Sequence, residues 1–525
     1  MSDVAENKAV AIVGCGIAGA TAFRTLLDRD DVGMTIHVFD QGRGGVGGRA
    51  SSRTRSDGGG GVAVACDETN DGAGREDANC NDEANDVTTM RWDHGCQFFR
   101  ADTTKFRSMV DEWMSRGLVR EWDGIFVSHP PDMSSDVEFF GLPSKPPFYV
   151  GMDGMQTFVR GILDDAIIAK KRKEKGRPSG SSSSLSFRIY EGTRVARLER
   201  TSEGDDGEKS RGKWRLWGTS GVAAYHDTPA ESIARLSRRG NDSGGGEDDD
   251  DDETRLFDVL GEEMGYDAII LTDASSSFDS WHRASAGIPE TFASAVRERF
   301  TSRVPLFAAM IAFDVERSDI PFDASSFDDP IVWFAARSNS KSGMKDGSLS
   351  NECWTIVSTP EYAMAKIEET PMQDPRTGEF IPQSKEYLAS VPGPDLYNAF
   401  VSLLRRHSRD GTIDKEDEDV PRHDYSLPNI VHLDAQRWGS ALPCHRQLTN
   451  DSTTRRFISG VPYDPARHPM APTKVERCGE SFLCDEGIMI FQAGDMMSTY
   501  TPGLEGAALS GCDAAERLHD IFSRG

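Results

Sequence analysis

Short apolar runs alternate with helical stretches at the start of the chain. Residues 9–13 form a fully apolar run that is typical of a buried strand, and residues 18–29 place alanine, phenylalanine and leucine at helical spacing. A second apolar strand is expected over residues 34–39. A strand, a helix and a strand of these lengths predict a βαβ unit, in which the two strands are parallel.

Two later segments, residues 266–273 and 487–495, have the same buried-strand character. Between them, residues 305–315 and 351–363 are typical of longer antiparallel strands. Because two kinds of sheet interleave along one chain, the sequence predicts an α/β fold with two domains. We expect a Rossmann-type dinucleotide-binding domain with an inserted, mainly antiparallel α+β substrate domain.

Each predicted domain is assembled from separate parts of the chain. The dinucleotide-binding domain takes residues 1–100, 187–285 and 485–525, and the substrate domain takes residues 101–186 and 286–484. Polar, glycine-rich or charged stretches interrupt both domains, and they can bury too little apolar surface to offset the cost of ordering. Mobile surface insertions are therefore expected at residues 55–89, 170–184, 201–254, 337–351, 366–388 and 408–424.

The charge of the chain limits its partners. The 525 residues carry a formal net charge of −27, and residues 247–253 are seven consecutive acidic side chains. Nucleic acids and anionic membranes are themselves negative, so neither is an expected partner. No apolar run approaches the roughly 18–20 residues that span a bilayer. We expect a small-molecule substrate instead.

Cysteine usage and the chain start bear on the compartment. Nine cysteines in a chain of this length do not form the dense pattern of a disulfide-stabilised protein. The acidic N-terminal segment enters a strand pattern within ten residues, which leaves no room for a targeting peptide. The basic run at residues 170–177 is interpreted as a solvated helix end, with a nuclear signal as the alternative. A reducing compartment, the cytoplasm, is expected.

A glycine motif follows the first predicted strand. Gly14, Gly16 and Gly19 have the spacing G-x-G-x-x-G. In a βαβ unit the first glycine permits a tight turn, the second lets a pyrophosphate approach the backbone, and the third lets helix and strand pack closely. The phosphates then lie at a helix N-terminus, where amides and the helix dipole favour negative charge. A tight turn without a ligand is the alternative.

An acidic residue completes the dinucleotide-binding pattern. Asp40 ends the second strand, where its carboxylate can bond both ribose hydroxyls. An acid at this position disfavours the 2′-phosphate of NADP, but the pattern does not separate NAD from FAD. The residues expected at the cofactor in this region are Gly14, Gly16, Ile17, Ala18, Gly19, Asp40 and Gln41.

A second glycine-rich turn, residues 44–48, comes about two dozen residues later and is followed by Arg49. Its backbone amides and the guanidinium could join the first turn on the same pyrophosphate. The alternative is a flexible glycine loop that continues into the insertion. These residues alone leave both interpretations open.

The stretch "GGRASSR" (residues 47–53) resembles the GGR-x-S/T element that follows the dinucleotide fold in amine-oxidase-type flavoproteins, where it contacts FAD. Three further stretches resemble the renalase-like branch of that family and its plant and algal oxidoreductase relatives. They are "RWDHGCQFF" (residues 91–99), "HLDAQRWGSALP" (residues 432–443) and "AGDMMSTYTPGLEGAALSG" (residues 493–511), and residues 151–158 and 339–343 are also similar to stretches of the family.

This resemblance implies FAD as the cofactor. Gly47, Gly48 and Arg49 would contact it, and Asp495 would accept a hydrogen bond from its ribityl or pyrophosphate region. A helix that opens at residues 505–508 would direct its N-terminal amides at the N1–C2=O edge of the flavin. Ser510 and Gly511 would keep this helix close to the sheet, although an ordinary core helix is the alternative. The further residues expected at the cofactor are Val195, Gly494, Glu505, Gly506, Ala507 and Ala508.

The reaction that the resemblance implies is hydride removal from a carbon beside nitrogen, in an amine or a reduced nicotinamide, with oxygen as the acceptor. No GxSxG, HExxH, Walker or EF-hand motif is present, so hydrolase, zinc-peptidase and NTPase functions are disfavoured and no metal is expected. No catalytic residue is assigned. Candidates for the flavin-facing pocket are Arg437, Trp438 and His445, each with a structural role as the alternative. A non-catalytic FAD-binding or sensing protein and an NAD-dependent dehydrogenase are the other function classes.

Overall fold

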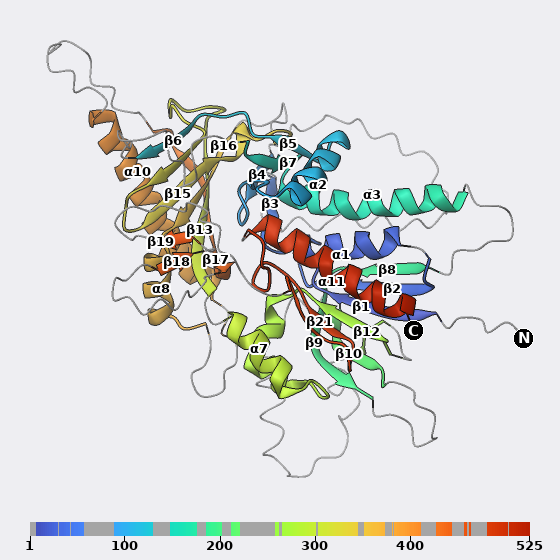
Figure 1. The fold of residues 1–525 in the computed structure, drawn as a ribbon. Coiled ribbons are helices and arrows are strands. Elements are labelled where there is room, and N and C mark those ends of the chain that lie inside the picture. The colour runs from blue at the N-terminus through green and yellow to red at the C-terminus, as the bar shows by residue number, and fades with distance from the viewer. Residues whose placement is uncertain are drawn as a thin grey trace, which may run out of the picture.

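The structure is a computed structural model, shown as a ribbon in Figure 1. It describes residues 7–29, 31–42, 44–56, 89–129, 147–175, 185–201, 212–220, 258–261, 265–300, 303–344, 351–372, 381, 383–410, 427–443, 456–458, 461–463, 480–501 and 503–524, which are the described residues below.

A six-stranded, largely parallel sheet forms the first structural unit. Its order is β20-β21-β12-β1-β2-β8, and only β20 runs antiparallel to its neighbour. Its strands are β1 (Lys8–Val13), β2 (Met34–Phe39), β8 (Ser186–Tyr190), β12 (Ala268–Leu271), β20 (Leu483–Asp485) and β21 (Ile490–Gln492). Strand β1 is almost entirely apolar and central, because both faces of a parallel sheet are covered. The carboxyl ends of the five parallel strands meet at one edge.

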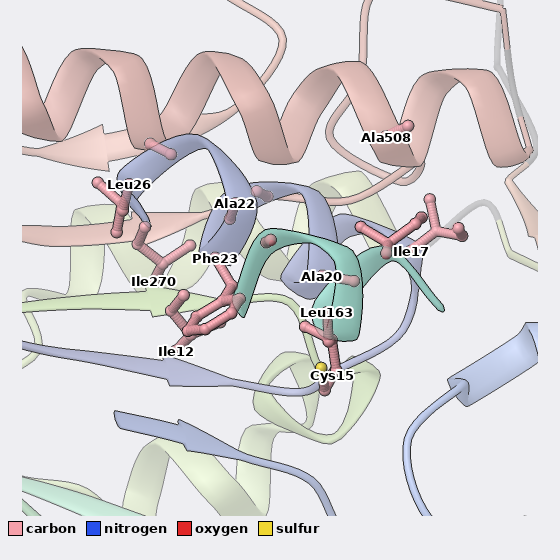
Figure 2. Packing of buried hydrophobic residues seen from close by; sticks show 14 of the residues in the cluster. Ile12, Cys15, Ile17, Ala20, Ala22, Phe23, Leu26, Leu163, Ile270 and Ala508 are labelled. Carbon is pink, nitrogen blue, oxygen red and sulfur yellow. The ribbon is translucent and has the colours of Figure 1, made fainter. Parts of the chain in front are cut away.

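Three helices cover one face of this sheet, as Figure 1 shows: α1 (Ile17–Asp28), α3 (Met155–Lys175) and α11 (Leu504–Arg524). Figure 2 shows Phe23 of α1 directed at Ile12 of β1. Both side chains are fully buried, which stabilises the layer by roughly 1.5–3 kcal/mol for each side chain of this size. Helices α1 and α11 cross closely, since a Cβ built on Gly511 would lie 2.1 Å from the carbonyl oxygen of Ala18.

The opposite face is covered by a three-stranded sheet of order β11-β10-β9 and by two helices. These elements are β9 (Thr193–Arg200), β10 (Trp214–Ser220), β11 (Asp258–Val259), α6 (Asp279–Ala284) and α7 (Glu290–Phe300). Trp214 and Trp281 are buried against Ala9, Ala11 and Val13 of β1. Val10 and Ile12, which alternate with these residues along β1, lie in the core on the other face. The side chains of one strand therefore belong to two separate cores.

The second structural unit is a six-stranded sheet of order β17-β13-β16-β15-β14-β6, in which only the β14–β6 pair is parallel. Its strands are β6 (Phe126–His129), β13 (Arg303–Phe313), β14 (Ala324–Phe327), β15 (Val332–Arg337), β16 (Glu352–Ser358) and β17 (Ile430–Pro443). Three helices pack on it around one apolar core: α8 (Pro360–Glu369), α9 (Lys385–Ser390) and α10 (Pro392–Asp410).

A hairpin after the second glycine turn ties the two units together. It consists of β3 (Ser52–Ser56) and β4 (Thr89–Asp93). Arg53 on β3 pairs with Asp434 on β17, and Arg55 Nη1 lies 2.8 Å from His432 Nδ1. The remaining elements are η1 (Gly48–Ala50), α2 (Thr104–Ser115), β5 (Val119–Glu121), β7 (Tyr149–Gly151), η3 (Ala274–Ser277), η4 (Ser338–Ser340), β18 (Arg456–Ile458) and β19 (Val461–Tyr463).

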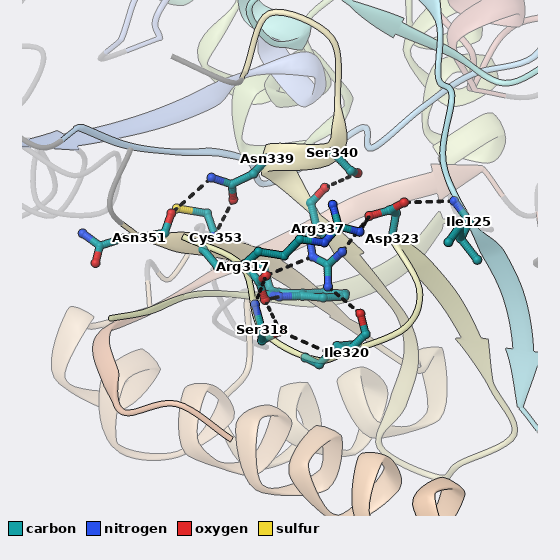
Figure 3. Close-up of polar contacts among 12 residues, drawn as sticks. Ile125, Arg317, Ser318, Ile320, Asp323, Arg337, Asn339, Ser340, Asn351 and Cys353 are labelled. Atoms are coloured by element: carbon teal, nitrogen blue, oxygen red, sulfur yellow. Dashed lines mark hydrogen bonds and ion pairs between the residues drawn. The ribbon is translucent and has the colours of Figure 1, made fainter. Parts of the chain in front are cut away.

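Residues 337–344 are a buried polar segment, which corrects the mobile surface insertion expected at residues 337–351. Arg337 Nη1 donates to Asp323 Oδ1 at 2.7 Å, as Figure 3 shows. Arg337 Nε lies 3.2 Å from Glu352 Oε2, and the Glu352 side chain is fully buried. Charged groups can be buried when they pair with one another, and composition alone does not register that pairing.

The predicted fold class is confirmed: a parallel, doubly covered sheet and a mainly antiparallel sheet are built from interleaved parts of one chain. Other expected insertions were also drawn too wide. Strand β10 (Trp214–Ser220) lies inside the expected insertion 201–254, where Trp214 and Leu216 are fully buried. Helix α3 continues to Lys175 inside 170–184, α8 to Glu369 inside 366–388, and α10 to Asp410 inside 408–424. Among the described residues, no helix combines the length and the apolar character needed to cross a bilayer.

Candidate functional site

The first glycine turn has the geometry that its spacing predicts. Gly14 follows β1 with a φ of +94°, and a Cβ on it would lie 2.7 Å from Oγ1 of Thr272. A Cβ on Gly19 would lie 2.1 Å from the carbonyl oxygen of Gly14. Both positions therefore exclude a side chain. At Gly14 the positive φ and the close contact both exclude it, and at Gly19 the close contact does. As a result α1 begins at the end of β1, with Ile17 and Ala18 in its first turn.

The second glycine turn packs directly on the first. Gly47 N donates to the carbonyl oxygen of Cys15 at 2.9 Å, and Gly16 and Gly47 form a parallel bridge. Gly47 and Gly48 have φ values of +145° and +55°, which glycine adopts readily. The atoms nearest to a Cβ on Gly16 would be backbone atoms of these two glycines, at 3.5 and 3.8 Å. The two turns thus form one continuous backbone surface beside the N-terminus of α1.

Asp40 lies at the carboxyl end of β2 and is buried. Its Oδ2 accepts a hydrogen bond from Cys15 N at 2.7 Å, and its Oδ1 accepts one from Gly42 N at 2.8 Å. Burial raises the pKa of the Asp40 carboxyl to about 6, although these two donors oppose the shift. The carboxylate links the first glycine turn to the loop after β2, and each oxygen keeps a second lone pair for a ribose hydroxyl.

Gln41 and Val195 lie at the margins of this edge. Gln41 Nε2 donates to Asp273 Oδ2 at 2.9 Å, at an exposed position beyond the carboxyl end of β12. Val195 is buried in β9, and its carbonyl oxygen accepts a hydrogen bond from Trp281 Nε1 at 3.4 Å. The structure therefore places Gln41 at the strand-end edge and Val195 in the three-stranded sheet that covers the second face.

Arg49 and Asp495, two residues expected at the cofactor, bind each other. Arg49 Nη1 donates to Asp495 Oδ2 at 2.8 Å, and Nη2 donates to Oδ1. The Asp495 side chain is 2% exposed, whereas that of Arg49 is 35% exposed. Burial lowers the pKa of the Arg49 guanidinium, but the charge of Asp495 outweighs it and the net shift is upward. The Arg49 guanidinium is therefore charged, balanced by Asp495 and partly open to solvent, beside the second glycine turn.

Gly494 indicates space for a ligand. It is buried, has a φ of +129°, and a Cβ built on it would meet no heavy atom of the described residues within 4 Å. Protein interiors are close-packed, so a buried glycine whose side-chain direction meets no described residue beyond its chain neighbours indicates room for another group. This space lies beside the Arg49–Asp495 pair at the edge where the parallel strands end, which is where open α/β sheets bind their ligands. The residues present fit a dinucleotide cofactor.

Glu505 has a role that the sequence did not predict. It lies in the first turn of α11 and is 2% exposed. Its Oε2 accepts a hydrogen bond from Asp102 N at 2.7 Å, and its Oε1 accepts one from Thr103 N at 3.2 Å. Burial raises the pKa of the Glu505 carboxyl, and these donors oppose the rise. Since Thr103 is the N-cap of α2, the carboxylate helps to hold the start of that helix against α11.

The other predicted residues of α11 dock this helix on α1. A Cβ on Gly506 would lie 2.6 Å from the carbonyl oxygen of Thr501, so the turn into the helix is tight. The carbonyl oxygen of Ala508 accepts a hydrogen bond from Thr21 Oγ1 at 2.9 Å, and Ala507 is half-buried. Because Thr21 is one turn into α1, the N-terminus of α11 lies close to the first glycine turn.

Ser510 and Gly511 have other contacts than the expected packing on the sheet. Ser510 Oγ accepts a hydrogen bond from Gly494 N at 2.9 Å and donates to the carbonyl oxygen of Ser481 at 2.6 Å. Gly511 approaches Ala18 of α1 rather than a strand. Ser510 thus holds the loop that carries Asp495, and Gly511 sets the distance between two helices.

Of the pocket candidates, Trp438 lies where the two units meet. Its Nε1 donates to the carbonyl oxygen of His94 at 2.7 Å, and the two rings stack with centroids 5.3 Å apart. Arg437 Nη2 donates to the carbonyl oxygen of Ile381 at 2.7 Å, and burial lowers its pKa to about 10. Neighbouring residues of a strand point to opposite faces, so Arg437 and Trp438 line different surfaces. His445 lies outside the described residues.

The segment from Asp93 to Gln97 connects the two units, and the sequence reasoning did not single out its residues. Lys341 Nζ donates hydrogen bonds to Asp93 Oδ2 at 3.0 Å and to Gln97 Oε1 at 3.1 Å. The Lys341 side chain is fully buried. Cys96 N donates to the carbonyl oxygen of Arg49 at 2.8 Å, which fixes this segment on the second glycine turn. Only the family-like stretches at residues 91–99 and 339–343 hinted at this cluster.

A separate cavity of about 520 Å³ opens beside the second glycine turn. Its lining includes Gly44, Arg91, Gln156 and Arg160. Gln156 Nε2 donates to the carbonyl oxygen of Gly44, and Arg160 is paired with Glu191. Because several polar groups of this cavity are bonded to protein atoms, we assign it no ligand.

No family model matches the chain. Among solved structures, a putrescine oxidase with bound putrescine aligns with 99% of this chain and 100% of its own, at 11% identity and a TM-score of 0.43. A cyclohexylamine oxidase from Brevibacterium oxydans aligns with 99% of this chain and 100% of its own, at 10% identity and a TM-score of 0.44. A reduced UDP-galactopyranose mutase aligns with 98% and 96%, at 9% identity and a TM-score of 0.44. Because these TM-scores lie below 0.5, we infer nothing from the likeness.

The fold of the chain defines its class. A parallel sheet covered on both faces carries a G-x-G-x-x-G turn between its central strand and the first helix, and an acid at the end of the next strand. This is the Rossmann-type dinucleotide-binding arrangement. It is combined here with a second, mainly antiparallel sheet and a second glycine turn that extends the binding edge.

Proposed function

We propose that the protein is an FAD-dependent oxidoreductase of the amine-oxidase-like type. The observation that carries this proposal is the space at buried Gly494, beside the Arg49–Asp495 pair, that no described residue fills. A long dinucleotide such as FAD requires a binding surface that extends beyond the first glycine turn. The second glycine turn, which packs on the first, supplies this surface. The resemblance of residues 47–53 and 493–511 to flavoprotein elements favours FAD over NAD.

The residues of the edge have distinct tasks in this proposal. Backbone amides of the two glycine turns bind the pyrophosphate, and Arg49 adds a positive charge that Asp495 holds in place. Asp40 accepts hydrogen bonds from ribose hydroxyls. The N-terminus of α11 favours negative charge nearby. When bound, FAD supplies a two-electron acceptor for a hydride.

The donor that we propose is a small molecule with a C–N group, either a reduced nicotinamide or an amine, with oxygen as the final acceptor. The substrate lies between the two sheets, where residues 93–97 and Trp438 meet the second glycine turn. The renalase-like resemblance favours the nicotinamide. We further propose the domain boundaries predicted above and a cytoplasmic location, in keeping with the free thiols of the described cysteines.

Absorbance spectroscopy of the purified protein tests this proposal. The oxidised protein should show flavin bands, and NADH, NADPH or benzylamine added under anaerobic conditions should bleach them. Bleaching by one donor class identifies the substrate. A yellow protein that no donor bleaches would favour a non-catalytic FAD-binding or sensing protein. A colourless protein that also fails to bind added FAD would leave an NAD-dependent dehydrogenase as the better proposal.

Two matched arginine variants locate the cofactor. Arg49→Ala should weaken FAD binding at least tenfold, because it removes a charge-assisted contact at the second turn. Arg29→Ala removes an arginine that pairs with Glu516 on the helical face, at 39% side-chain exposure, and should leave FAD binding unchanged. Isothermal titration of the apoprotein with FAD measures both. Equal affinities in the two variants would contradict a cofactor position at Arg49.

A further inference from the structure

His94 carries an unused hydrogen-bonding atom at the junction of the two units. The residue is 7% exposed, and its Nδ1 has no hydrogen-bond partner among the described residues. The other ring nitrogen, Nε2, lies 3.4 Å from Ser51 Oγ. One face of the ring stacks on Trp438, and the backbone carbonyl of His94 is held by the Trp438 indole. The ring is thus fixed in orientation while one of its polar atoms is unused.

Such an atom is costly unless something binds it. Buried polar atoms are nearly always paired, and an exception calls for an explanation such as a ligand. The position of His94 favours a ligand. The following residues, Gly95 and Cys96, pack on the backbone of Arg49, where a Cβ on Gly95 would lie 2.1 Å from the Arg49 carbonyl oxygen. His94 therefore lies between the proposed cofactor edge and β17.

The charge state of the imidazole sets what kind of group it can bind. Burial lowers the pKa of His94 to about 4, and the positive charge of Arg53 adds to this, against the opposing charges of Asp93 and Asp434. The ring is therefore neutral near pH 7. We assign the proton of the neutral ring to Nε2, which can donate to Ser51 Oγ, so that Nδ1 offers a lone pair. A lone pair in this environment accepts a hydrogen bond from an N–H group.

We propose that His94 is a substrate-binding residue whose Nδ1 accepts a hydrogen bond from an N–H of the donor, with Trp438 holding the ring in place. This inference rests on the proposed oxidoreductase function. The ligand chemistry is an uncharged N–H, which a nicotinamide carboxamide and a free amine share. NADH and benzylamine as alternative donors distinguish the two sources.

Three variants separate ligand binding from a structural role. His94→Phe keeps a ring that can stack on Trp438 but removes both nitrogens. His94→Asn keeps a polar atom near the position of Nδ1, and His94→Gln keeps one near Nε2. His519→Phe is the control, because His519 is a similarly buried histidine on α11 whose Nε2 lies 2.9 Å from Asp31 Oδ1. Thermal unfolding of the apoproteins and anaerobic flavin reduction by NADH or benzylamine are measured for each variant.

The expected pattern differs between the two histidines. His94→Phe should unfold close to the wild type, since removal of the unpaired Nδ1 offsets the loss of the 3.4 Å contact between Nε2 and Ser51 Oγ, whereas His519→Phe should unfold at a lower temperature. His94→Phe should lower kred/Kd, the rate constant of flavin reduction divided by the dissociation constant of the donor, roughly 5- to 100-fold. The FAD content should be unchanged. His94→Asn should recover part of that loss and His94→Gln should not. His519→Phe should leave flavin reduction unchanged.

The contrary outcomes are distinct. A lower unfolding temperature for apo His94→Phe, together with an equal loss of flavin reduction in His94→Asn, would mean that the ring has a structural role only, and would overturn the inference. Unchanged flavin reduction in His94→Phe would also overturn it while leaving the oxidoreductase proposal standing. Absence of flavin reduction by any donor in the wild type would overturn the proposed function and, with it, the inference.

Discussion

Arg49 and Asp495 are separated by 446 positions in the sequence and form a bidentate ion pair beside the carboxyl edge of the parallel sheet. The arginine follows the second glycine turn and the aspartate follows the last strand of the sheet. This pair joins the segment after the second glycine turn to the loop after the last parallel strand. The whole second sheet lies between these two segments in the sequence.

The Arg49–Asp495 ion pair should contribute to the free energy of unfolding of the protein. Asp495→Asn leaves Arg49 without its buried counter-charge and should lower the free energy of unfolding by roughly 1–3 kcal/mol, below the value for a fully buried pair because Arg49 is 35% exposed. Urea unfolding of Asp495→Asn, Arg49→Ala and the double variant measures the coupling. Additive effects in the double variant would show that the pair contributes nothing of its own.

Asp40 should make the apoprotein less stable as the pH rises through mildly acidic values. Its folded pKa of about 6 lies above the ordinary value of 3.8, so the folded state holds the proton more tightly than the unfolded chain. Its contribution is full below about pH 4 and is lost as the pH rises through 6, by roughly 2–3 kcal/mol.

The comparison for this pH effect is Asp40→Asn, which does not titrate. The variant should lose stability at all pH values, because one of the two N–H groups on Asp40 loses its acceptor. The wild type should nevertheless lose stability relative to this variant between pH 4 and pH 6. Asp111→Asn, at an exposed position on α2, is the control. Parallel pH profiles for wild type and Asp40→Asn in urea unfolding would be inconsistent with a raised pKa.

Local spacing was enough to predict the elements that position the site. The G-x-G-x-x-G spacing places three glycines in one turn, and Gly14 and Gly19 each carry out a steric task that depends on residues close in sequence or on the sheet that every βαβ unit requires. The apolar runs at residues 9–13 and 34–39 correspond to β1 and β2 within one residue. These features depend on backbone geometry that the sequence encodes within a few positions.

The direction of individual side chains was not predictable in the same way. The expectation for Glu505 concerned the amides of its helix N-terminus and stays a prediction, but the sequence did not indicate that its carboxylate holds the start of α2, which lies against α11. Lys341 lies in a stretch whose polar composition predicted a surface insertion, yet it is buried because Asp93 and Gln97 lie opposite. Each of these positions depends on a partner more than 200 residues away.

Glu505 should therefore affect folding before it affects the cofactor. Glu505→Ala leaves two buried N–H groups at the start of α2 without their acceptor and should cost roughly 1–3 kcal/mol in urea unfolding of the apoprotein. Glu505→Gln keeps one amide oxygen and should cost less. Glu516→Ala, on the same helix and 42% exposed, should change the stability by less than about 0.5 kcal/mol. A stable Glu505→Ala apoprotein with weakened FAD binding would place the carboxylate at the cofactor instead.

Gly511 sets the distance between α1 and α11, and so the position of the first glycine turn. A Cβ at this position would lie 2.1 Å from the backbone carbonyl oxygen of Ala18, which cannot move without shifting α1. Gly511→Ala gains about 1 kcal/mol of helix propensity, but the forced separation of the helices should outweigh it, for a net loss of roughly 1–3 kcal/mol.

Gly161→Ala, in the interior of α3, is the matched control for this substitution. The nearest atom to a Cβ there is Cδ2 of Leu118, at 2.6 Å, at the end of a side chain that can rotate away. Urea unfolding should therefore show Gly161→Ala close to the wild type and Gly511→Ala clearly below it. Since α1 carries the amides of the first turn, Gly511→Ala should also weaken binding of added FAD, whereas Gly161→Ala should not. Equal stability and equal FAD affinity in the two variants would mean that the helix crossing is too loose to position the turn.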